Sequence, residues 1–237
     1  ANALRELEVI VKWNPWSVVA EQFRVAATRL ALLQYASKGK VTVITSAVKG
    51  EGKSVIAANL AFALARDMGK RTLLVDGDLK CPTVHEYWGI PQAPGLRDVL
   101  QGTQSLQSCL RQEGQLPLWI LPSGADRGRA VDDLSRISQI SEILARLREQ
   151  YDFILIDAPP VLPLADMHVM VGLADMVTFV IRAGLTPRHA VEGALRTLGA
   201  ASKNMSIILN ELEARGLPYY MHQGYEYPIG KEEAGVR

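Results

Sequence analysis

Short apolar runs alternate with longer segments of mixed polarity along most of the 237-residue chain. Runs of four or five apolar residues that end at Gly, Pro or Asp indicate buried strands, whereas apolar residues at every third or fourth position indicate helices. Strands are predicted from Val41 and at residues 72–75, 118–121, 153–156, 177–181 and 207–209, and helices at residues 17–33, 54–68, 96–100, 106–110, 137–148 and 187–198. This alternation predicts an α/β fold, a mostly parallel sheet with helices on both faces.

Residues 17–215 carry the alternation without a linker, repeat or low-complexity block, so they are predicted to form one domain. The lead-in at residues 1–16 is expected to be extended around Pro15, which disfavours helix at the residue before it. Residues 216–237 form a tail whose glycines and prolines interrupt any regular helix. From the residues alone, its tyrosines belong either to a flexible tail or to a contact with the domain or another copy. The tail tyrosines are Tyr219, Tyr220, Tyr225 and Tyr227.

A glycine-bearing loop, AVKGEGKS, follows the first predicted strand. It fits the phosphate-binding pattern of a small residue, any four residues and then Gly-Lys-Ser, with Ala47 where Gly is usual. Gly50 and Gly52 allow successive N–H groups to point at phosphate oxygens, and the following helix adds its free N–H groups and dipole. Lys53 is predicted to contact the β- and γ-phosphates, and Ser54 to hold Mg²⁺. A glycine-rich turn with a solvated lysine is the alternative interpretation.

Aspartates stand at the ends of two predicted strands. Asp76 and Asp78 follow the strand at 72–75, and Asp157 follows the apolar run at 153–156. Parallel α/β sheets bind their ligands at the carboxyl ends of the strands. If the strand at 72–75 lies beside the first strand, its two acids approach the γ-phosphate and the metal, while Asp157 is placed to hold a water on Mg²⁺. Taken alone, the first pair would be interpreted as an acidic turn.

The overall composition narrows the choice of partners. A formal net charge of +1 gives no strong field toward nucleic acid or anionic lipid. No apolar run approaches the length of a membrane span and the start of the chain lacks a signal-peptide pattern, so a cytoplasmic location is expected. Cys81 and Cys109 are too few for a disulfide framework and match no metal motif, so they are expected to be reduced thiols.

Three motifs in this order, AVKGEGKS, LLVDGDLK and FILIDAPP, resemble the bacterial tyrosine kinases (BY-kinases), a branch of the MinD- and ParA-like P-loop ATPases. The likeness extends from Pro15 to about Tyr227. Further similar stretches are EQFR at 21–24, His85, GLRDVL at 95–100, LPSG at 121–124, Tyr151–Asp152, Arg182, Thr186 and the tyrosine-rich tail.

This resemblance implies an ATP- and Mg²⁺-dependent protein-tyrosine autokinase that acts in capsular or exopolysaccharide synthesis and export. Asp76 would be the base for the incoming tyrosine, with Lys53, Asp78 and Asp157 completing the catalytic set. The implied metal residues are Ser54, Asp76 and Asp157, and the implied nucleotide contacts are Lys49, Gly50, Glu51, Gly52, Lys53, Ser54, Val55 and Asn210, the last reading adenine. The tail tyrosines Tyr219, Tyr220, Tyr225 and Tyr227 would be the phosphoacceptors.

The family likeness also implies partners. Subunits would form a homo-oligomeric ring in which each tail reaches a neighbour's active site, with Glu21 and Arg24 at the oligomer contact. A membrane adaptor, the polysaccharide co-polymerase, would activate the kinase and recruit it to the inner face of the cell membrane, and a tyrosine phosphatase would oppose it. No nucleic acid partner is expected.

The chain departs from the family patterns at three positions. Ala27 stands where the helix motif has a second arginine, and Arg29 lies two places further on. Lys80 replaces an arginine and lacks its planar fork of donors. Val48 stands where MinD and ParA loops have an extra lysine, and Lys49 is one place off.

Other functional classes remain as alternatives. MinD-type ATPases that cycle on membranes resemble one another in carrying a C-terminal amphipathic helix. The glycines and prolines of this tail exclude such a helix. A ParA-type ATPase that binds DNA is disfavoured by the near-neutral charge and by the lack of a basic run. A non-catalytic interaction module is disfavoured because Lys53, Ser54, Asp76 and Asp157 are all present.

Overall fold

The computed structural model describes residues 8–125, 137–162, 167–199 and 204–212. Its strands are β1 (Val41–Ser46), β2 (Thr72–Asp76), β3 (Arg111–Gln112), β4 (Leu118–Leu121), β5 (Phe153–Asp157), β6 (Met176–Arg182) and β7 (Met205–Asn210). Its helices are α2 (Ile10–Trp13), α3 (Val18–Ser37), α4 (Lys53–Arg66), α5 (Val84–Tyr87), α6 (Leu96–Leu100), α7 (Leu106–Cys109), α8 (Ile137–Gln150), α9 (Met167–Leu173) and α10 (Arg188–Leu198).

Within the described ranges, the strands form one seven-stranded sheet in the order β3-β4-β2-β5-β1-β6-β7. All neighbouring strands are parallel except β3, which pairs antiparallel with β4 at one edge. Every residue of β1 and of β5 is buried. Strands covered on both faces favour apolar side chains on both, which is why residues 153–156 appear as a continuous apolar run. Strand β1 also buries Thr42, Thr45 and Ser46, and the hydroxyls of Thr45 and Ser46 donate to the carbonyl oxygens of Pro159 and Val48. The predicted α/β class with a mostly parallel sheet is confirmed.

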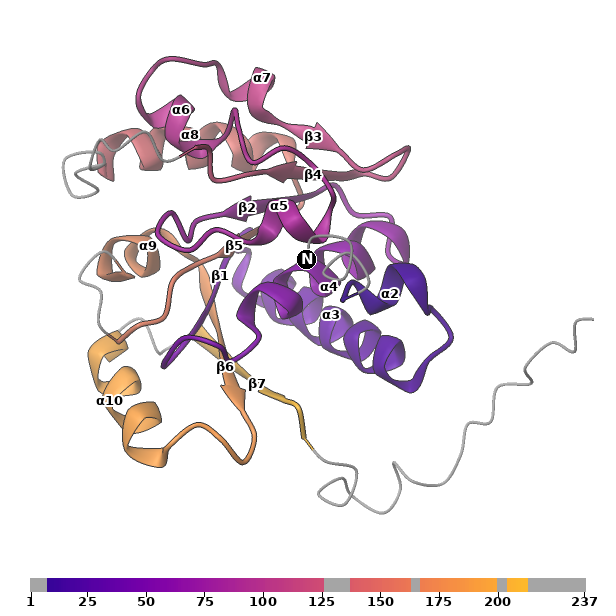
Figure 1. The fold of residues 1–237 in the computed structure, drawn as a ribbon, viewed down its shortest axis with the longest axis vertical. Coiled ribbons are helices and arrows are strands. Elements are labelled where there is room, and N and C mark those ends of the chain that lie inside the picture. Colours follow the sequence, from indigo (N-terminus) through magenta and orange to yellow (C-terminus); the bar gives the residue numbers. More distant parts are fainter. Residues whose placement is uncertain (1–7, 126–136, 163–166, 200–203, 213–237) are drawn as a thin grey trace, which may run out of the picture.

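Helices cover both faces of the sheet, as predicted. On one face, the helices from α2 through α5 pack against strand side chains such as Ile44 and Leu155. On the other face, the helices from α6 through α10 pack against the adjacent strand residues Val43 and Ile154. Figure 1 shows α3 and α4 on one side of the sheet and α9 and α10 on the other. Helix α4 is buried almost all round, which explains why residues 54–68 are apolar on every face.

The strand order differs from the arrangement on which the two acids after 72–75 were expected to reach the phosphate loop. Strand β5 lies between β1 and β2, so β2 is not a neighbour of β1. The acids of β2 still reach the site because β5 is only one strand wide and ends in an aspartate. This residue, Asp157, pairs with Ile44 of β1 on one side and with Asp76 of β2 on the other.

The lead-in is partly helical, so the expectation of an extended segment is wrong for Trp13, which ends α2. Asn14, directly before Pro15, does leave the helical conformation. The cause of the helix is tertiary: Val11 is fully buried, and its N–H donates to Oδ1 of Asn59 in α4 at 3.1 Å. Val9 and Val11 therefore anchor this segment to the domain, while Trp13 and Trp16 remain exposed.

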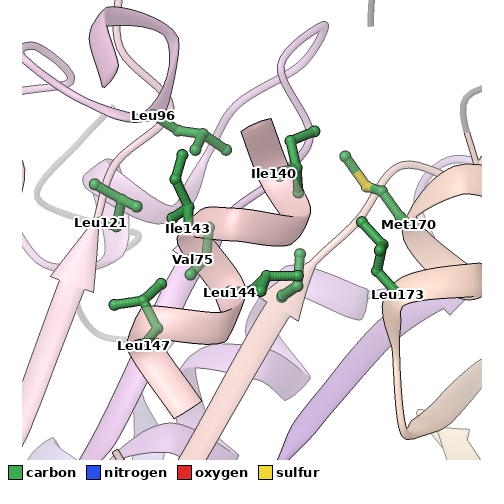
Figure 2. A pocket seen from close by; sticks show the side chains of 11 residues that line it. Val75, Leu96, Leu121, Ile140, Ile143, Leu144, Leu147, Met170 and Leu173 are labelled. Atoms are coloured by element: carbon green, nitrogen blue, oxygen red, sulfur yellow. The ribbon is translucent and has the colours of Figure 1, made fainter. Parts of the chain in front are cut away.

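A small apolar cavity of about 40 Å³ lies on the α8 and α9 side of the sheet (Figure 2). Its walls include Val75, Gly77 and Ile156, which flank the acids at the ends of β2 and β5. No charged side chain lines it, so it offers no partner to a phosphate or metal ion.

None of the helices in the described ranges is long and apolar enough to cross a membrane.

Candidate functional site

The phosphate-binding loop connects β1 to α4 and takes a shape that only its glycines allow easily. Gly50 and Gly52 have φ angles of +87° and +84°, in the left-handed region that side chains disfavour. Gly52 is the N-cap of α4 and has no side-chain cap there, which leaves the first turn of the helix open to an anion. A Cβ at Gly52 would lie 2.1 Å from Nδ2 of Asn210, whereas one at Gly50 would meet nothing within 4 Å.

Lys53 extends from the first turn of α4 toward a cluster of carboxylates. Its Nζ lies 3.0 Å from Oδ2 of Asp78 and 3.8 Å from Oδ1 of Asp157. The same Nζ is 3.5 Å from the hydroxyl of Ser54. The fold thus brings together the predicted lysine, serine and two of the acids, although they lie in three separate sequence motifs.

Asp76 and Asp157 are fully buried side by side at the carboxyl ends of β2 and β5. Oδ2 of Asp76 accepts the N–H of Val84 at 3.1 Å, but its Oδ1 and both oxygens of Asp157 lack a hydrogen-bond partner among the described residues. Gly77 fixes the loop after β2 by donating its N–H to the carbonyl oxygen of Asp157 at 2.8 Å. Buried polar atoms without partners are rare and often mark the place of a ligand or ion.

Burial and mutual repulsion raise the pKa values of these acids. Burial first, and then the charge of Asp157, hold the pKa of Asp76 well above its usual range. Burial raises the pKa of Asp157 to about 6, although the nearby Lys53 ammonium opposes the change. Burial alone would lower the pKa of Lys53, but the charges of Asp157 and Asp78 outweigh it and raise that pKa. The site concentrates negative charge that a cation would stabilise.

The residues present fit a nucleotide with Mg²⁺. Mg²⁺ usually keeps several waters and is held by one or two carboxylates together with substrate phosphates, rather than by a cage of protein ligands. Accordingly, no cluster of three His, Cys, Asp or Glu side chains in the described ranges is arranged to hold a metal ion by itself. The unpartnered oxygens of Asp76 and Asp157 and the hydroxyl of Ser54 are the groups that would face the ion and its waters.

The other side of the loop contacts the carboxyl ends of β6 and β7. Asn210, the last residue of β7, donates from Nδ2 to the carbonyl oxygen of Glu51 at 3.0 Å. Nη1 of Arg182 lies 3.3 Å from the carbonyl oxygen of Gly50, and its guanidinium also pairs with Glu211. Asn210, which was expected to read adenine, is therefore placed directly against the phosphate loop.

Sequence reasoning missed the role of one side chain in the loop. Glu51 was predicted only as part of the nucleotide-binding stretch, yet its side chain is buried and hydrogen-bonded to Thr186 and to the N–H of Val48. The sequence does contain one signal of this role: an acidic residue is unexpected in a loop that binds anions, which indicates that its side chain makes contacts other than with phosphate.

Three remaining groups of predicted residues lie apart from the acids. Lys49 reaches Sγ of the exposed Cys81 at 3.5 Å. Glu21 and Arg24, expected at the oligomer contact, form an i,i+3 pair at 2.9 Å, and Arg24 also binds Asp67 of the same chain. Val55 occupies the first turn of α4. The tail tyrosines Tyr219, Tyr220, Tyr225 and Tyr227 lie outside the described residues.

Comparison with known proteins gives consistent relatives. The family model described as an AAA domain matches residues 39–211. Tyrosine-protein kinase YwqD of Bacillus subtilis is 32% identical over 220 residues, which cover 92% of this chain and 90% of YwqD. The succinoglycan biosynthesis transport protein ExoP of Rhizobium meliloti is 31% identical over 234 residues, which cover 96% of this chain but 30% of ExoP. The chain thus spans nearly all of YwqD and under a third of ExoP.

Solved structures share the fold. The chimerical protein CapA2B2 matches with a TM-score of 0.77 and 28% identity, covering 86% of this chain and 90% of that one. The MinD protein of Pyrococcus horikoshii in complex with Mg-ADP matches with a TM-score of 0.60 and 28% identity, covering 76% of this chain and 74% of that one. The match to CapA2B2 extends over more of the chain than the match to MinD.

Proposed function

Because this chain belongs to the AAA-domain family and, within it, to the bacterial tyrosine kinases, we propose that it is a protein-tyrosine autokinase. It transfers the γ-phosphoryl group of ATP to tyrosines of its own tail. The observation that carries the proposal is the meeting of Lys53 with Asp78 and Asp157 at the phosphate loop, with Asp76 beside Asp157, where buried carboxylate oxygens lack hydrogen-bond partners among the described residues.

Lys53 and the start of α4 would bind the phosphates. In the described structure Lys53 pairs with Asp78, and the same ammonium lies within reach of Asp157. Its charge and the open N–H groups of the first helical turn offset the negative charge of a polyphosphate. When bound, Mg²⁺–ATP supplies the transferable phosphoryl group, and the ion neutralises charge on the phosphate oxygens. Ser54 and Asp157 would orient the ion and its waters.

Asp76 would accept the proton of the tyrosine hydroxyl. A tyrosine hydroxyl has a pKa near 10 and is a weak nucleophile while protonated, so a carboxylate within hydrogen-bond reach assists its attack. The raised pKa of Asp76 makes its carboxylate a stronger base and brings that pKa closer to the pKa of the tyrosine hydroxyl whose proton it must accept. As the Tyr O–P bond forms, ADP leaves with the electrons of the broken P–O bond.

The tail tyrosines would be delivered in trans to a neighbouring copy within a ring. Tethering raises the local concentration of an acceptor to roughly millimolar without new contacts. Glu21 and Arg24 are proposed for the contact between copies, on the side of the molecule where α3 also exposes apolar residues such as Val18 and Leu32. The closeness of Asn210 to the phosphate loop supports its proposed contact with adenine.

The physiological setting follows from the relatives and is proposed with the activity. The name of ExoP concerns succinoglycan biosynthesis and transport. For this chain we infer regulation of capsular or exopolysaccharide synthesis and export, a cytoplasmic location at the inner face of the cell membrane, a membrane adaptor as activator and a tyrosine phosphatase as antagonist.

Incubation with Mg²⁺ and ATP followed by phosphopeptide mapping tests the activity, with Lys53→Met as the control. Several phosphates on Tyr219, Tyr220, Tyr225 and Tyr227 are expected, and none in the Lys53→Met variant. ATP hydrolysis without phosphate on the protein would contradict the proposal and favour a MinD- or ParA-type ATPase.

A mixing experiment tests transfer in trans. One variant keeps Lys53 but carries Phe at all four tail positions, so it has no acceptor in the tail. The other is Lys53→Met with its tyrosines intact, so it has no activity of its own. Tail phosphate on the Lys53→Met chain only after mixing is the expected result. Its absence, with an active wild type, would indicate transfer within one chain.

A further inference from the structure

The side chain of Glu51 lies inside the phosphate loop and points toward the end of β6. Only 2% of the residue is exposed. Oε2 accepts the N–H of Val48 at 2.7 Å, so the carboxylate closes the loop on itself. Oε1 accepts the hydroxyl of Thr186 and lies 3.5 Å from the N–H of Arg182.

Thr186 connects this carboxylate to the sheet. Its hydroxyl donates to Glu51 and accepts the N–H of Arg182, the last residue of β6, at 3.1 Å. The N–H of Thr186 also donates to the carbonyl oxygen of Arg182 at 3.0 Å. Through these bonds, the loop is joined to a strand within the sheet rather than only to its own two ends.

Charge alone would make Glu51 a poor choice at this position. A carboxylate a few ångströms from bound phosphates repels them, and the effect is strongest where water is excluded. Among the described residues, the groups bonded to this carboxylate are neutral N–H and O–H donors, and the guanidinium of Arg182 is directed at Glu211 and at the carbonyl oxygen of Gly50 instead. The carboxylate must therefore supply something other than attraction.

What it supplies is conformational order. The loop contains two glycines in left-handed conformations, and glycine loses more conformational freedom on ordering than any other residue. The two hydrogen bonds that this buried carboxylate accepts, from the N–H of Val48 within the loop and from the hydroxyl of Thr186 outside it, fix the loop from both sides. A loop ordered before the nucleotide arrives costs less free energy to order at binding.

We propose that Glu51 is a positioning residue, with Thr186 as its partner, that holds the phosphate loop in the nucleotide-binding conformation. The inference rests on the proposed function, because it concerns how the nucleotide is bound. It separates geometry from charge: glutamine at position 51 retains an acceptor for Val48 and a partner for Thr186 but lacks the negative charge, whereas alanine removes both.

Binding of ADP with a fluorescent label on its ribose, in the presence of Mg²⁺, tests the proposal without requiring phosphoryl transfer. The variants are Glu51→Ala, Glu51→Gln, Thr186→Val, Thr186→Ser and the double variant Glu51→Ala/Thr186→Val. Glu192→Ala is the matched control, because Glu192 pairs with the exposed Arg188 one turn earlier on α10, away from the phosphate loop. Binding is measured well below the unfolding midpoint of every variant.

We expect Glu51→Ala to weaken ADP binding about tenfold, which corresponds to about 1.4 kcal/mol. Glu51→Gln should bind about as tightly as the wild type, because the repulsion is gone, the amide oxygen still accepts the N–H of Val48, and the amide NH2 can donate to the hydroxyl of Thr186. Thr186→Val should weaken binding several-fold and Thr186→Ser should restore it. The double variant should bind no more weakly than Glu51→Ala, because both substitutions remove one shared contact.

Wild-type or tighter binding by Glu51→Ala would overturn the inference, since charge would then outweigh geometry. Equal losses for Glu51→Gln and Glu51→Ala, or additive losses in the double variant, would overturn it as well. A lowered unfolding midpoint of Glu51→Ala with unchanged ADP binding would assign Glu51 to stability alone. Failure of the wild type to bind ADP would instead contradict the proposed function.

Discussion

Each end of the sheet carries a pair of aspartates, and the two pairs have opposite surroundings: those at the amino end are exposed or half-buried, and those at the carboxyl end are fully buried. At the amino end, Asp175 directly precedes β6, and its Oδ2 accepts the N–H groups of Lys40 and Val41 at 2.7 and 2.8 Å. Asp152 directly precedes β5 and accepts the N–H of Arg71 at 2.9 Å. Each of these carboxylates joins the start of one strand to the start of its neighbour.

At the carboxyl end, Asp76 and Asp157 are more deeply buried but less well partnered. Three of their four carboxylate oxygens have no hydrogen-bond partner in the part of the chain that the structure describes. A buried polar group that lacks a partner costs about 1–3 kcal/mol, and a charged group more. The same residue type therefore stabilises the fold at one end of the sheet and costs stability at the other, where the ligand is proposed to bind.

The largest expected effect is that of Asp76→Asn. The amide still accepts the N–H of Val84 and can donate toward Asp157, so the buried repulsion is relieved, but the proposed base is lost. Phosphoryl transfer should fall by about 10²–10⁴-fold, the usual contribution of a general base, while the thermal unfolding midpoint rises. Phosphate incorporation and thermal unfolding measure the two effects. A fall in both would place Asp76 with the structural aspartates of the other end.

Substitution of the two loop glycines by alanine separates backbone conformation from crowding at the carboxyl end. Both have φ near +85°, so each alanine carries a conformational cost of about 1–2 kcal/mol. Gly52→Ala adds a clash with Asn210, worth about 1–3 kcal/mol more, whereas Gly50→Ala meets nothing. ADP affinity and the thermal unfolding midpoint should both fall further for Gly52→Ala, and Asn210→Ala should recover part of the excess loss in the unfolding midpoint. Equal losses for Gly52→Ala and Gly50→Ala would show that the Asn210 side chain moves aside without a measurable cost in free energy.

The free energy of unfolding should rise as the pH falls, because the buried charge of Asp157 is unfavourable. Because the pKa of Asp157 is raised in the folded state, from 3.8 to about 6, the folded protein binds a proton more readily than the unfolded chain. Its unfavourable contribution at pH 7 should therefore disappear as the pH falls from about 6 to 4, a gain of about 3 kcal/mol. Denaturant unfolding without Mg²⁺ at several pH values, compared with Asp157→Asn, measures this. A variant with the wild-type pH slope would contradict it.

The smallest expected effect is that of Asp175→Asn, which should act in the opposite direction. Partial burial alone would raise the pKa of Asp175, but hydrogen bonds from Arg148 and from the N–H groups of Val41 and Lys40 lower it. Its contribution is present above the unfolded pKa and is lost as the pH falls through the lowered folded value. At pH 7 the variant should lose about 1 kcal/mol, a modest value because the pair with Arg148 is partly exposed. A gain in stability would remove the contrast between the two ends.

Most strands could be predicted from the sequence because buried parallel strands favour apolar residues on both faces. Strand β3 could not, since Arg111–Gln112 is a two-residue polar segment that pairs only at an edge. The strand order was also beyond local sequence information, because nothing in residues 153–157 states that they separate β1 from β2. The helix at Ile10–Trp13 depends on its packing against α4, a contact between segments far apart in the chain.

The candidate site could be predicted in part for a similar reason. Lys53, Asp76 and Asp157 lie in short motifs whose residue types suggest phosphate chemistry. The bond from Thr186 to Glu51 joins positions 135 residues apart, and no periodicity or spacing connects them. Side chains that act on a ligand can be recognised by residue type, whereas side chains that position the loop can be recognised only from their contacts.

The place of β5 in the sheet has a consequence for synthesis of the chain. Val41 of β1 pairs with Ile154 on one side, and Val43 pairs with Val177 on the other, so both neighbours of β1 are translated more than a hundred residues later. At about 5–20 residues per second, the apolar β1 and β2 leave the ribosome on the order of ten seconds before the strand that joins them. Sheets built from such distant pairs fold slowly. During this interval β1 lacks both of its partner strands, and β2 can pair only with β4, so the nascent domain exposes unpaired edges of apolar strands.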